Sequence, residues 1–244
     1  MDSETRRLKL IEIQNNRDNV VMTGIPLHYK GSVHRCNVYR IPLSLLIYNK
    51  YNGRIVMEVK SYERQYRTLD AERDVDRKII EDFLYYSKED RNEKTMESLL
   101  RLTQQKHGIV TDDGVIIDGN RRARLLNKLY HEREELGFTF QEVEHCQYFL
   151  AIILPEKGEE KDLQQLETIY QMGEDAKLDY NPIGKYLKCS DLKRVGFSNK
   201  DISEFMGEKE SQIADRLAIL ELMEDFLDTY GYKGKTHTRF AGHS

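Results

Sequence analysis

The spacing of apolar residues divides the chain into a mixed front part and a helical rear part. Residues 37–49 (NVYRIPLSLLIYN) predict a strand followed by a short apolar turn, and alternation in residues 55–62 (IVMEVKSY) predicts a second strand. Residues 72–87 and 93–105 show the spacing of helices, whereas residues 1–36 have too weak a periodicity for an assignment. The face of the first helix expected to point inward comprises Val75, Ile79, Ile80, Phe83 and Leu84.

The clearest local pattern lies in the middle of the chain. Two β-branched runs, 109–111 and 115–117, flank Asp112-Asp113-Gly114, which predicts a hairpin because glycine tolerates the positive φ of a tight turn. Asp118-Gly119-Asn120 follows at once and precedes a helix. Residues 147–154 (QYFLAIIL) then predict a buried strand. The apolar positions expected on that helix are Leu125, Leu126, Leu129, Tyr130 and Leu136.

Beyond the charged, glycine-containing break at Lys157–Lys161 every predicted element is helical. One helix spans 162–172, and another begins near Pro182, because proline suits a first helical position. Ser198 and Asp201 predict a capping box at the start of a third helix. Two more are expected, the first with Ile213, Leu217 and Leu220 facing inward and the second with Met223, Phe226 and Leu227, ending near Gly231. The expected domains are 1–158, with 1–36 poorly assigned, and 159–231, followed by a tail over 232–244.

Charge is distributed unevenly along a chain whose formal net charge is −4. Residues 1–67 carry 12 Lys/Arg against 6 Asp/Glu, whereas residues 196–231 carry 3 against 9. Any phosphate-binding surface is therefore expected in the N-terminal part. The absence of a signal-like apolar region or a long apolar run predicts no membrane association. Three widely spaced cysteines fit a reduced cytoplasm better than a disulfide framework, and no metal-ligand spacing is visible.

The turn at Asp118-Gly119-Asn120 has the chemistry of an anion site. A helix that starts directly after a strand presents free backbone N–H groups and its positive dipole end there. Arg121, Arg122 and Arg124 crowd this end, which is unfavourable for the helix itself, and a bound polyphosphate would relieve the conflict. The alternative is a basic turn whose arginines pair with nearby acids, namely Asp112, Asp113 or Glu132.

The same residues resemble a family motif. Gly119-Asn-Arg-Arg-Ala-Arg124-Leu is similar to the phosphate motif of ParB proteins, usually Gly-Glu-Arg-Arg-x-Arg-Ala. Residues 41–54 resemble the family's opening strand and turn, where Arg54 matches the family arginine, and residues 196–220 reproduce the spacing of its helix-turn-helix. The resemblance implies an α+β chain: a ParB/sulfiredoxin-like N-terminal α/β domain followed by an all-α helix-turn-helix domain.

For function, the resemblance implies a cytoplasmic, DNA-associated protein of the plasmid-partition kind. A nucleoside triphosphate, CTP favoured, would bind with Mg²⁺ at Arg54, Gly119, Asn120 and the three arginines 121, 122 and 124, and would switch the conformation or close a homodimer. DNA contacts would come from Ser211, Gln212 and Arg216 on the expected recognition helix. The acids around these three residues leave open that the helices instead bind a protein partner.

Two departures from the family pattern weaken the case for chemistry. The turn Asp118–Arg121 has no cysteine, so sulfiredoxin-type reduction is not expected. The second nucleotide motif, Glu-Asn-x-Gln-Arg, is reduced to Glu167-Thr-Ile-Tyr-Gln171, which leaves at most a weak CTPase. One alternative is a phosphotransferase or nuclease-like enzyme of the same superfamily, with Glu167 or Asp118 as the acid/base group. Another is a non-catalytic scaffold in a plasmid or phage-defence system.

Overall fold

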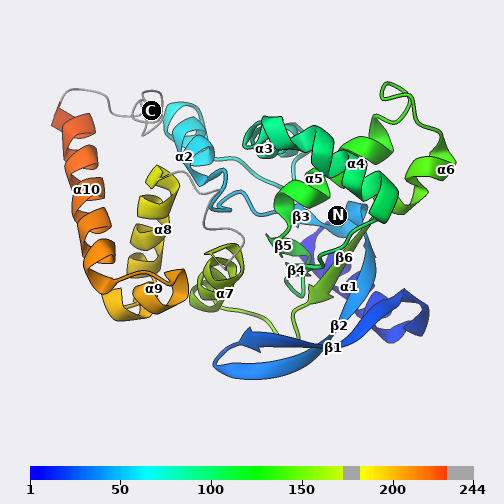
Figure 1. Cartoon of the computed structure of the whole chain (residues 1–244), viewed down its shortest axis with the longest axis horizontal. Coiled ribbons are helices and arrows are strands. Elements are labelled where there is room, and N and C mark those ends of the chain that lie inside the picture. The colour runs from blue at the N-terminus through cyan, green and yellow to red at the C-terminus, as the bar shows by residue number, and fades with distance from the viewer. Residues whose placement is uncertain (173–181, 230–244) are drawn as a thin grey trace. The chain divides into compact units, whose positions relative to one another are not determined.

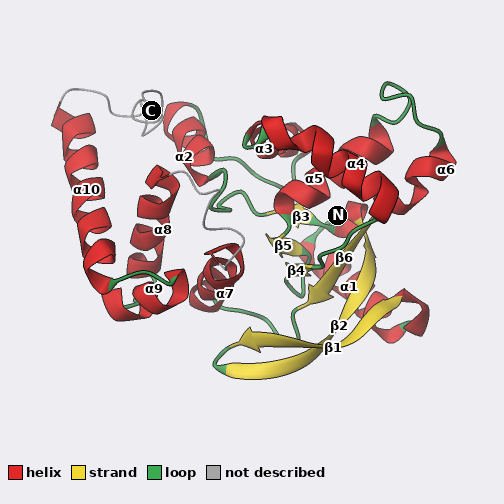
Figure 2. Ribbon diagram, in the orientation of Figure 1, coloured by secondary structure: helices red, strands yellow, loops and turns green. Residues whose placement is uncertain are grey.

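The computed structural model describes residues 1–172 and 182–229, which form a mixed α+β protein (Figures 1 and 2). Tight internal contacts divide it into two compact units. Unit 1 comprises residues 1–49 and 71–157, and unit 2 comprises residues 50–70 with the chain from Gly158 onward. The chain passes between units after Lys157, inside the charged break. Residues 50–70, which the sequence analysis counts with the N-terminal domain, group with the C-terminal helices.

Unit 1 is built on a six-stranded mixed sheet with the strand order β1-β2-β6-β4-β5-β3. β1, β2 and β6 pair antiparallel, β4 runs parallel to β6 and antiparallel to β5, and β3 runs parallel to β5. The expected hairpin at Asp112-Asp113-Gly114 is confirmed, with a φ of 89° at Gly114. The strands are β1 (Val20–Tyr29), β2 (Ser32–Pro42), β3 (Ile47–Tyr48), β4 (Gly108–Val110), β5 (Val115–Asp118) and β6 (Tyr148–Ile153).

Five α-helices accompany this sheet in the described part of unit 1. α5 packs against β6 and lies between α3 and α4 (Figure 1). α1, whose N-terminus is capped by the Asp2 carboxylate, packs against β2 instead. These helices are α1 (Ser3–Asn15), α3 (Asp74–Tyr86), α4 (Asn92–Leu102), α5 (Asn120–His131) and α6 (Phe140–Val143).

The predicted core faces of these helices are largely confirmed. Ile80 and Leu84 of α3 are fully buried. Leu125, Leu126 and Leu129 of α5 are likewise inaccessible to solvent. Two assignments are wrong. Val75 is 65% exposed because the buried face of α3 comprises Asp76, Ile80 and Leu84 and excludes it. Leu136 lies beyond the end of α5 at His131.

The strand predicted over residues 55–62 is wrong, because this segment forms helix α2 (Val56–Gln65) of unit 2. Its side chains Val56 and Met57 pack with Ile183 and Leu187 of α8. At the helix start, the Asn52 carbonyl accepts hydrogen bonds from the N–H groups of residues 55 and 56. The apolar residues at the start of this segment fit either a pleated face or a helical one, and the distant partners select the helix.

The remaining helices of unit 2 follow the predicted order. Pro182 does begin a helix, and the Ser198–Asp201 capping box is present, with both reciprocal bonds formed. Gly207 turns the chain with a φ of 61°, and α10 begins three residues later. The two helices predicted after Gly207 form one, because no proline or glycine interrupts residues 210–229. The helices are α7 (Glu160–Met172), α8 (Pro182–Arg194), α9 (Asn199–Met206) and α10 (Glu210–Thr229). No helix in residues 1–172 or 182–229 combines the length and apolarity needed to cross a membrane.

The carboxyl group of Glu58 in α2 is buried without full hydrogen bonding, so its effect on stability should depend on pH. Its Oε2 atom is buried and has no hydrogen-bond partner among the described residues, and burial raises the pKa of the carboxyl. The folded state therefore binds the proton more tightly than the unfolded state, and Glu58 destabilises the fold as pH rises through this pKa. We expect Glu58→Gln to be more stable at pH 7 by on the order of 1 kcal/mol.

Urea unfolding across pH checks this expectation. The gain should vanish below about pH 4, where the carboxyl is protonated in both states. The control is Glu97→Gln on the exposed side of α4, which should change stability by less than about 0.5 kcal/mol. An equal gain at pH 4 and pH 7 would contradict the assignment to the Glu58 charge.

Candidate functional site

Gly119 forms the turn between β5 and α5, and its conformation excludes other residues. Its φ is +97°, in the left-handed region. A Cβ atom built on it would lie 2.6 Å from Cζ of the Phe149 ring. The same ring blocks a side chain at Gly108, where a Cβ would also lie 2.6 Å from the Asp118 carbonyl oxygen. Backbone alone can therefore occupy this corner, and the first N–H groups of α5 follow directly after the strand.

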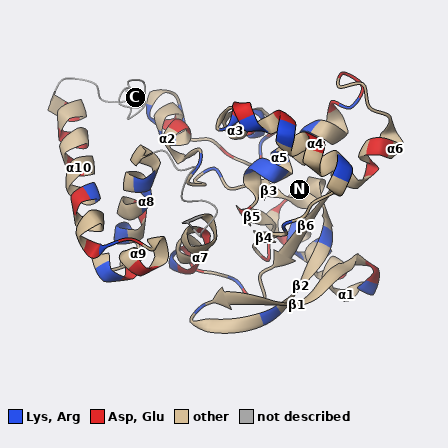
Figure 3. Ribbon diagram, viewed as in Figure 1, with Lys and Arg blue, Asp and Glu red and all other residues tan. Residues whose placement is uncertain are grey.

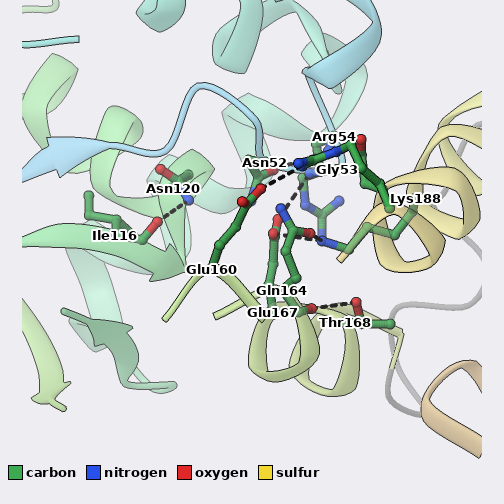
Figure 4. Close-up of polar contacts among 12 residues, drawn as sticks. Asn52, Gly53, Arg54, Ile116, Asn120, Glu160, Gln164, Glu167, Thr168 and Lys188 are labelled. Carbon is green, nitrogen blue, oxygen red and sulfur yellow. Dashed lines mark hydrogen bonds and ion pairs between the residues drawn. The ribbon is translucent and has the colours of Figure 1, made fainter. Parts of the chain in front are cut away.

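The side chain of Asn120 holds the turn in place. It is buried, and its Oδ1 accepts a hydrogen bond of 2.9 Å from the Asn49 N–H, just after β3. Its Nδ2 donates a bond of 2.9 Å to the Ile116 carbonyl of β5, as Figure 4 shows. Asn120 was predicted as a phosphate ligand, but both polar atoms of its side-chain amide form hydrogen bonds that position α5 relative to β3 and β5. Its backbone N–H remains part of the helix start.

Arg121 and Arg122 fasten the first turn of α5 to neighbouring segments of unit 1. Nε of Arg121 donates to Oδ1 of Asn92 at 3.1 Å, and its Nη2 lies 3.4 Å from Oγ1 of Thr95. Arg122 donates to the carbonyl of Lys106. No Asp or Glu lies in the first turn of α5, so its basic end is not neutralised by the helix itself.

Arg124 is buried and its charge is compensated by two carboxylates. Its Nη2 lies 3.4 Å from Oε1 of Glu132, and its Nε lies 3.9 Å from Oε2 of Glu81. The guanidinium also lies over the ring of Tyr85, 5.8 Å from its centroid. The pairing alternative is therefore realised for Arg124 with Glu132.

The other two acids of that alternative are engaged elsewhere. Asp112 pairs with Arg7 of α1 at 3.2 Å. Asp113 accepts a hydrogen bond of 3.0 Å from the Ser3 hydroxyl. The hairpin turn is thereby tied to α1, and its carboxylates serve the fold of unit 1.

The pKa of His107 reports the local electrostatics beside this turn. It is lowered first by burial and next by the positive charge of Arg122, while Asp118 acts in the opposite direction. At this imidazole the positive charge of Arg122 therefore has a larger effect on the pKa than the charge of Asp118. Asp118 itself ends β5 directly before Gly119, as the sequence analysis places it.

Glu167 lies in unit 2 within a buried polar cluster. Its Oε1 accepts a hydrogen bond of 3.1 Å from the Gly53 N–H, and its Oε2 pairs with Nζ of Lys188 at 2.8 Å (Figure 4). The Lys188 ammonium also donates to Oε1 of Gln164 at 2.6 Å. Glu167 and Lys188 are each 2% exposed. This carboxylate joins the turn before α2 to α7 and α8, and proton transfer by it would require breaking a buried ion pair.

Arg54, also expected to contribute to phosphate binding, follows Gly53 in the same turn of unit 2. Its backbone N–H donates to Oδ1 of the buried Asn52 at 3.1 Å. No hydrogen bond or ion pair engages its guanidinium among residues 1–172 and 182–229. Lys188 was not predicted as a site residue, although its two apolar neighbours, Leu187 and Cys189, are a sequence signal of a buried charge with a partner.

The expected DNA-contacting residues lie in the first two turns of α10. Ser211 and Gln212 are exposed, but Oε1 of Gln212 caps the helix by accepting a bond of 3.0 Å from the Lys209 N–H. The Arg216 guanidinium is paired with Glu208, which also pairs with Lys185 at 3.4 Å. Acidic and basic positions are interspersed on α9 and α10 (Figure 3). Two of the three residues are thus used inside unit 2.

The cysteines take no part in these clusters. Cys36, Cys146 and Cys189 are buried and unbridged, and burial raises the pKa of Cys146 to about 12. The thiolate needed for redox chemistry is therefore disfavoured there. Within the described ranges, no group of three or more His, Cys, Asp or Glu side chains is arranged to hold a metal ion.

Comparison with known proteins adds no further constraint on the site. No family model matches the chain, and no curated protein matches its sequence.

Proposed function

We propose that unit 1 binds the phosphate end of a nucleotide at the start of α5. The observation that supports this most directly is the Gly119 turn. Gly119 has a left-handed backbone conformation and no side chain, and hydrogen bonds from the Asn120 side chain fix the turn. Two arginines follow, and the first turn of α5 contains no Asp or Glu. Helix N-termini of this kind stabilise phosphate oxygens through backbone N–H groups and the helix dipole.

The resemblance to ParB proteins favours CTP as this nucleotide. It also implies that the chain forms a DNA-associated homodimer and that the nucleotide acts as a conformational or dimerisation switch. Mg²⁺ in such sites binds through one or two carboxylates and the phosphates themselves. Asp118, directly before Gly119, is the side chain suited to that role. Arg121 and Arg122 would supply bidentate charge to the phosphates by exchanging their present hydrogen bonds.

Calorimetric titration of the full chain with CTP, ATP and GTP in the presence of Mg²⁺ tests this proposal. We expect one nucleotide to bind and Arg122→Ala to weaken it at least tenfold, since a charge-assisted contact contributes about 1.5–3 kcal/mol. Arg101→Ala, which removes an exposed charge from α4 of the same unit, is the matched control and should bind as the wild type does. Absence of binding by all three nucleotides contradicts the proposal.

One observation argues against DNA contact by α10 and so leaves a protein partner as the second candidate for the helices of unit 2. Gln212 and Arg216, which should reach DNA, are engaged with Lys209 and Glu208. We propose that DNA bound by this chain owes little to α10. The test is the slope of the logarithm of DNA affinity against the logarithm of salt concentration. In Arg216→Ala this slope should fall by less than about one, because that arginine neutralises no phosphate. A loss of about one or more would restore α10 as the recognition helix.

A further inference from the structure

Unit 1 contains a half-open cavity of about 440 Å³ that lies on the sheet and is not formed by the Gly119–Arg122 turn. Its apolar wall includes Leu126 of α5 and Leu150 of β6. Arg40 of β2, Glu144 and Tyr148 contribute polar groups to the same cavity. Its size and its mixture of apolar surface with a few polar groups are those of small-molecule sites.

One edge of the cavity contains a strained residue followed by a buried amide. Thr103, at the end of α4, has a φ of 58° and a ψ of −164°, a conformation that a β-branched residue rarely adopts. The next residue, Gln104, is buried and clamps its amide onto β6, accepting a bond of 3.0 Å from the Leu150 N–H and donating one of 2.6 Å to the Leu150 carbonyl. A strained backbone conformation persists only where contacts with the surrounding structure fix it, and such conformations are concentrated at ligand sites.

The charged groups of the cavity have no charged partner within the described chain. The Arg40 guanidinium lies over the ring of Tyr148, 5.8 Å from its centroid, and makes no hydrogen bond or ion pair with residues 1–172 or 182–229. The Glu144 carboxylate is equally unengaged in those residues, and the two groups do not pair with each other. Arg40 and Glu144 are exposed, whereas the buried Arg6 and Arg124 of the same unit each pair with a carboxylate.

We propose that this cavity binds a small zwitterion with an apolar body, the chemical class of a free apolar α-amino acid. The ligand carboxylate accepts hydrogen bonds from Arg40, and its ammonium donates to Glu144. Its side chain lies against Val21 of β1 and Leu150 of β6. Two opposite charges that share a cavity without pairing match a ligand that carries both charges, whereas a simple anion would be repelled by Glu144 and a simple cation by Arg40.

The test is a calorimetric titration of the full chain with leucine and phenylalanine. Matched probes that lack one charge are 3-phenylpropionate, which has no ammonium, and 2-phenylethylamine, which has no carboxylate. We expect at least one amino acid to bind and both single-charge probes to bind roughly tenfold or more weakly, because each loses one charge-assisted hydrogen bond. Arg40→Gln and Glu144→Gln should each reduce amino-acid binding by a similar factor, while Arg101→Ala should not.

Several outcomes would overturn the proposal. These are no binding by either amino acid, equal binding of 3-phenylpropionate, or binding unchanged in both Arg40→Gln and Glu144→Gln. Both substitutions lie at exposed positions, and thermal melting without ligand verifies that the variants fold. If Arg40→Gln fails to fold, the test rests on two comparisons. These are amino-acid binding by Glu144→Gln against the wild type, and wild-type binding of 2-phenylethylamine and 3-phenylpropionate against that of phenylalanine. Nucleotide titration is independent of these results, so either site can fail alone.

Discussion

Replacing Lys188 with methionine should lower the free energy of unfolding by about 3–5 kcal/mol. The substitution leaves the carboxylate of Glu167 buried with no opposite charge, and its remaining bond from the Gly53 N–H does not compensate for the lost hydration. Methionine retains most of the volume of the lysine stem, so little apolar packing is lost. The free-energy cost therefore comes mainly from the uncompensated buried charge.

Urea denaturation measures this effect, and two further variants isolate its cause. Arg194→Met removes one partner of the Arg194–Glu160 pair, whose side chains are 58% and 59% exposed, and should cost less than about 1 kcal/mol. The double variant Glu167→Gln with Lys188→Met keeps an acceptor for Gly53 and should recover much of the lost stability. If the double variant were as unstable as Lys188→Met, the buried charge would not be the cause.

Gly119→Ala should lower the free energy of unfolding by about 2–5 kcal/mol. Part of this cost is the positive φ of +97°, and the rest comes from the new methyl group 2.6 Å from Cζ of Phe149. Phe149 is fully buried, so its ring cannot move without displacing other core side chains. If a folded fraction remains, its nucleotide affinity should also fall, since the corner that leads into α5 is displaced.

Thermal and urea unfolding of a matched pair of glycine variants separates the two costs. Gly137 also has a positive φ, of +79°, but no atom lies within 4 Å of the position a Cβ would take. Gly137→Ala should therefore show only the backbone cost of about 1–3 kcal/mol. Adding Phe149→Leu to Gly119→Ala tests the clash by removing part of the ring. Equal losses in Gly119→Ala and Gly137→Ala would show that Phe149 does not restrict the turn.

The two proposed sites of unit 1 share helix α5. Its first turn follows Gly119, where we propose that phosphate binds, and Leu126, two turns later, lines the cavity. The residues between them anchor the helix, because Arg121 and Arg124 are bonded to Asn92 and Glu132. The arginines of this segment thus have two effects: they leave no acid to neutralise the helix start, and they bond α5 to its neighbours.

The amino-acid sequence by itself determined the local features of this protein. The hairpin at Asp112-Asp113-Gly114, the helix start at Pro182 and the Ser198–Asp201 capping box depend on interactions between residues fewer than ten positions apart. Such interactions leave a legible signature, because the partners and the conformation they require appear together in one short segment. The helix after Asp118-Gly119-Asn120 was predictable for the same reason.

Tertiary structure alone decided which polar groups are buried, paired or left for a ligand. Residues 55–62 became a helix because α8, more than 120 residues away, offers Ile183 and Leu187 to its apolar side chains. The same holds for the ion pair of Lys188 with Glu167 and for the cavity around Arg40. Burial and charge compensation depend on neighbours brought together by folding, and no local pattern specifies those neighbours.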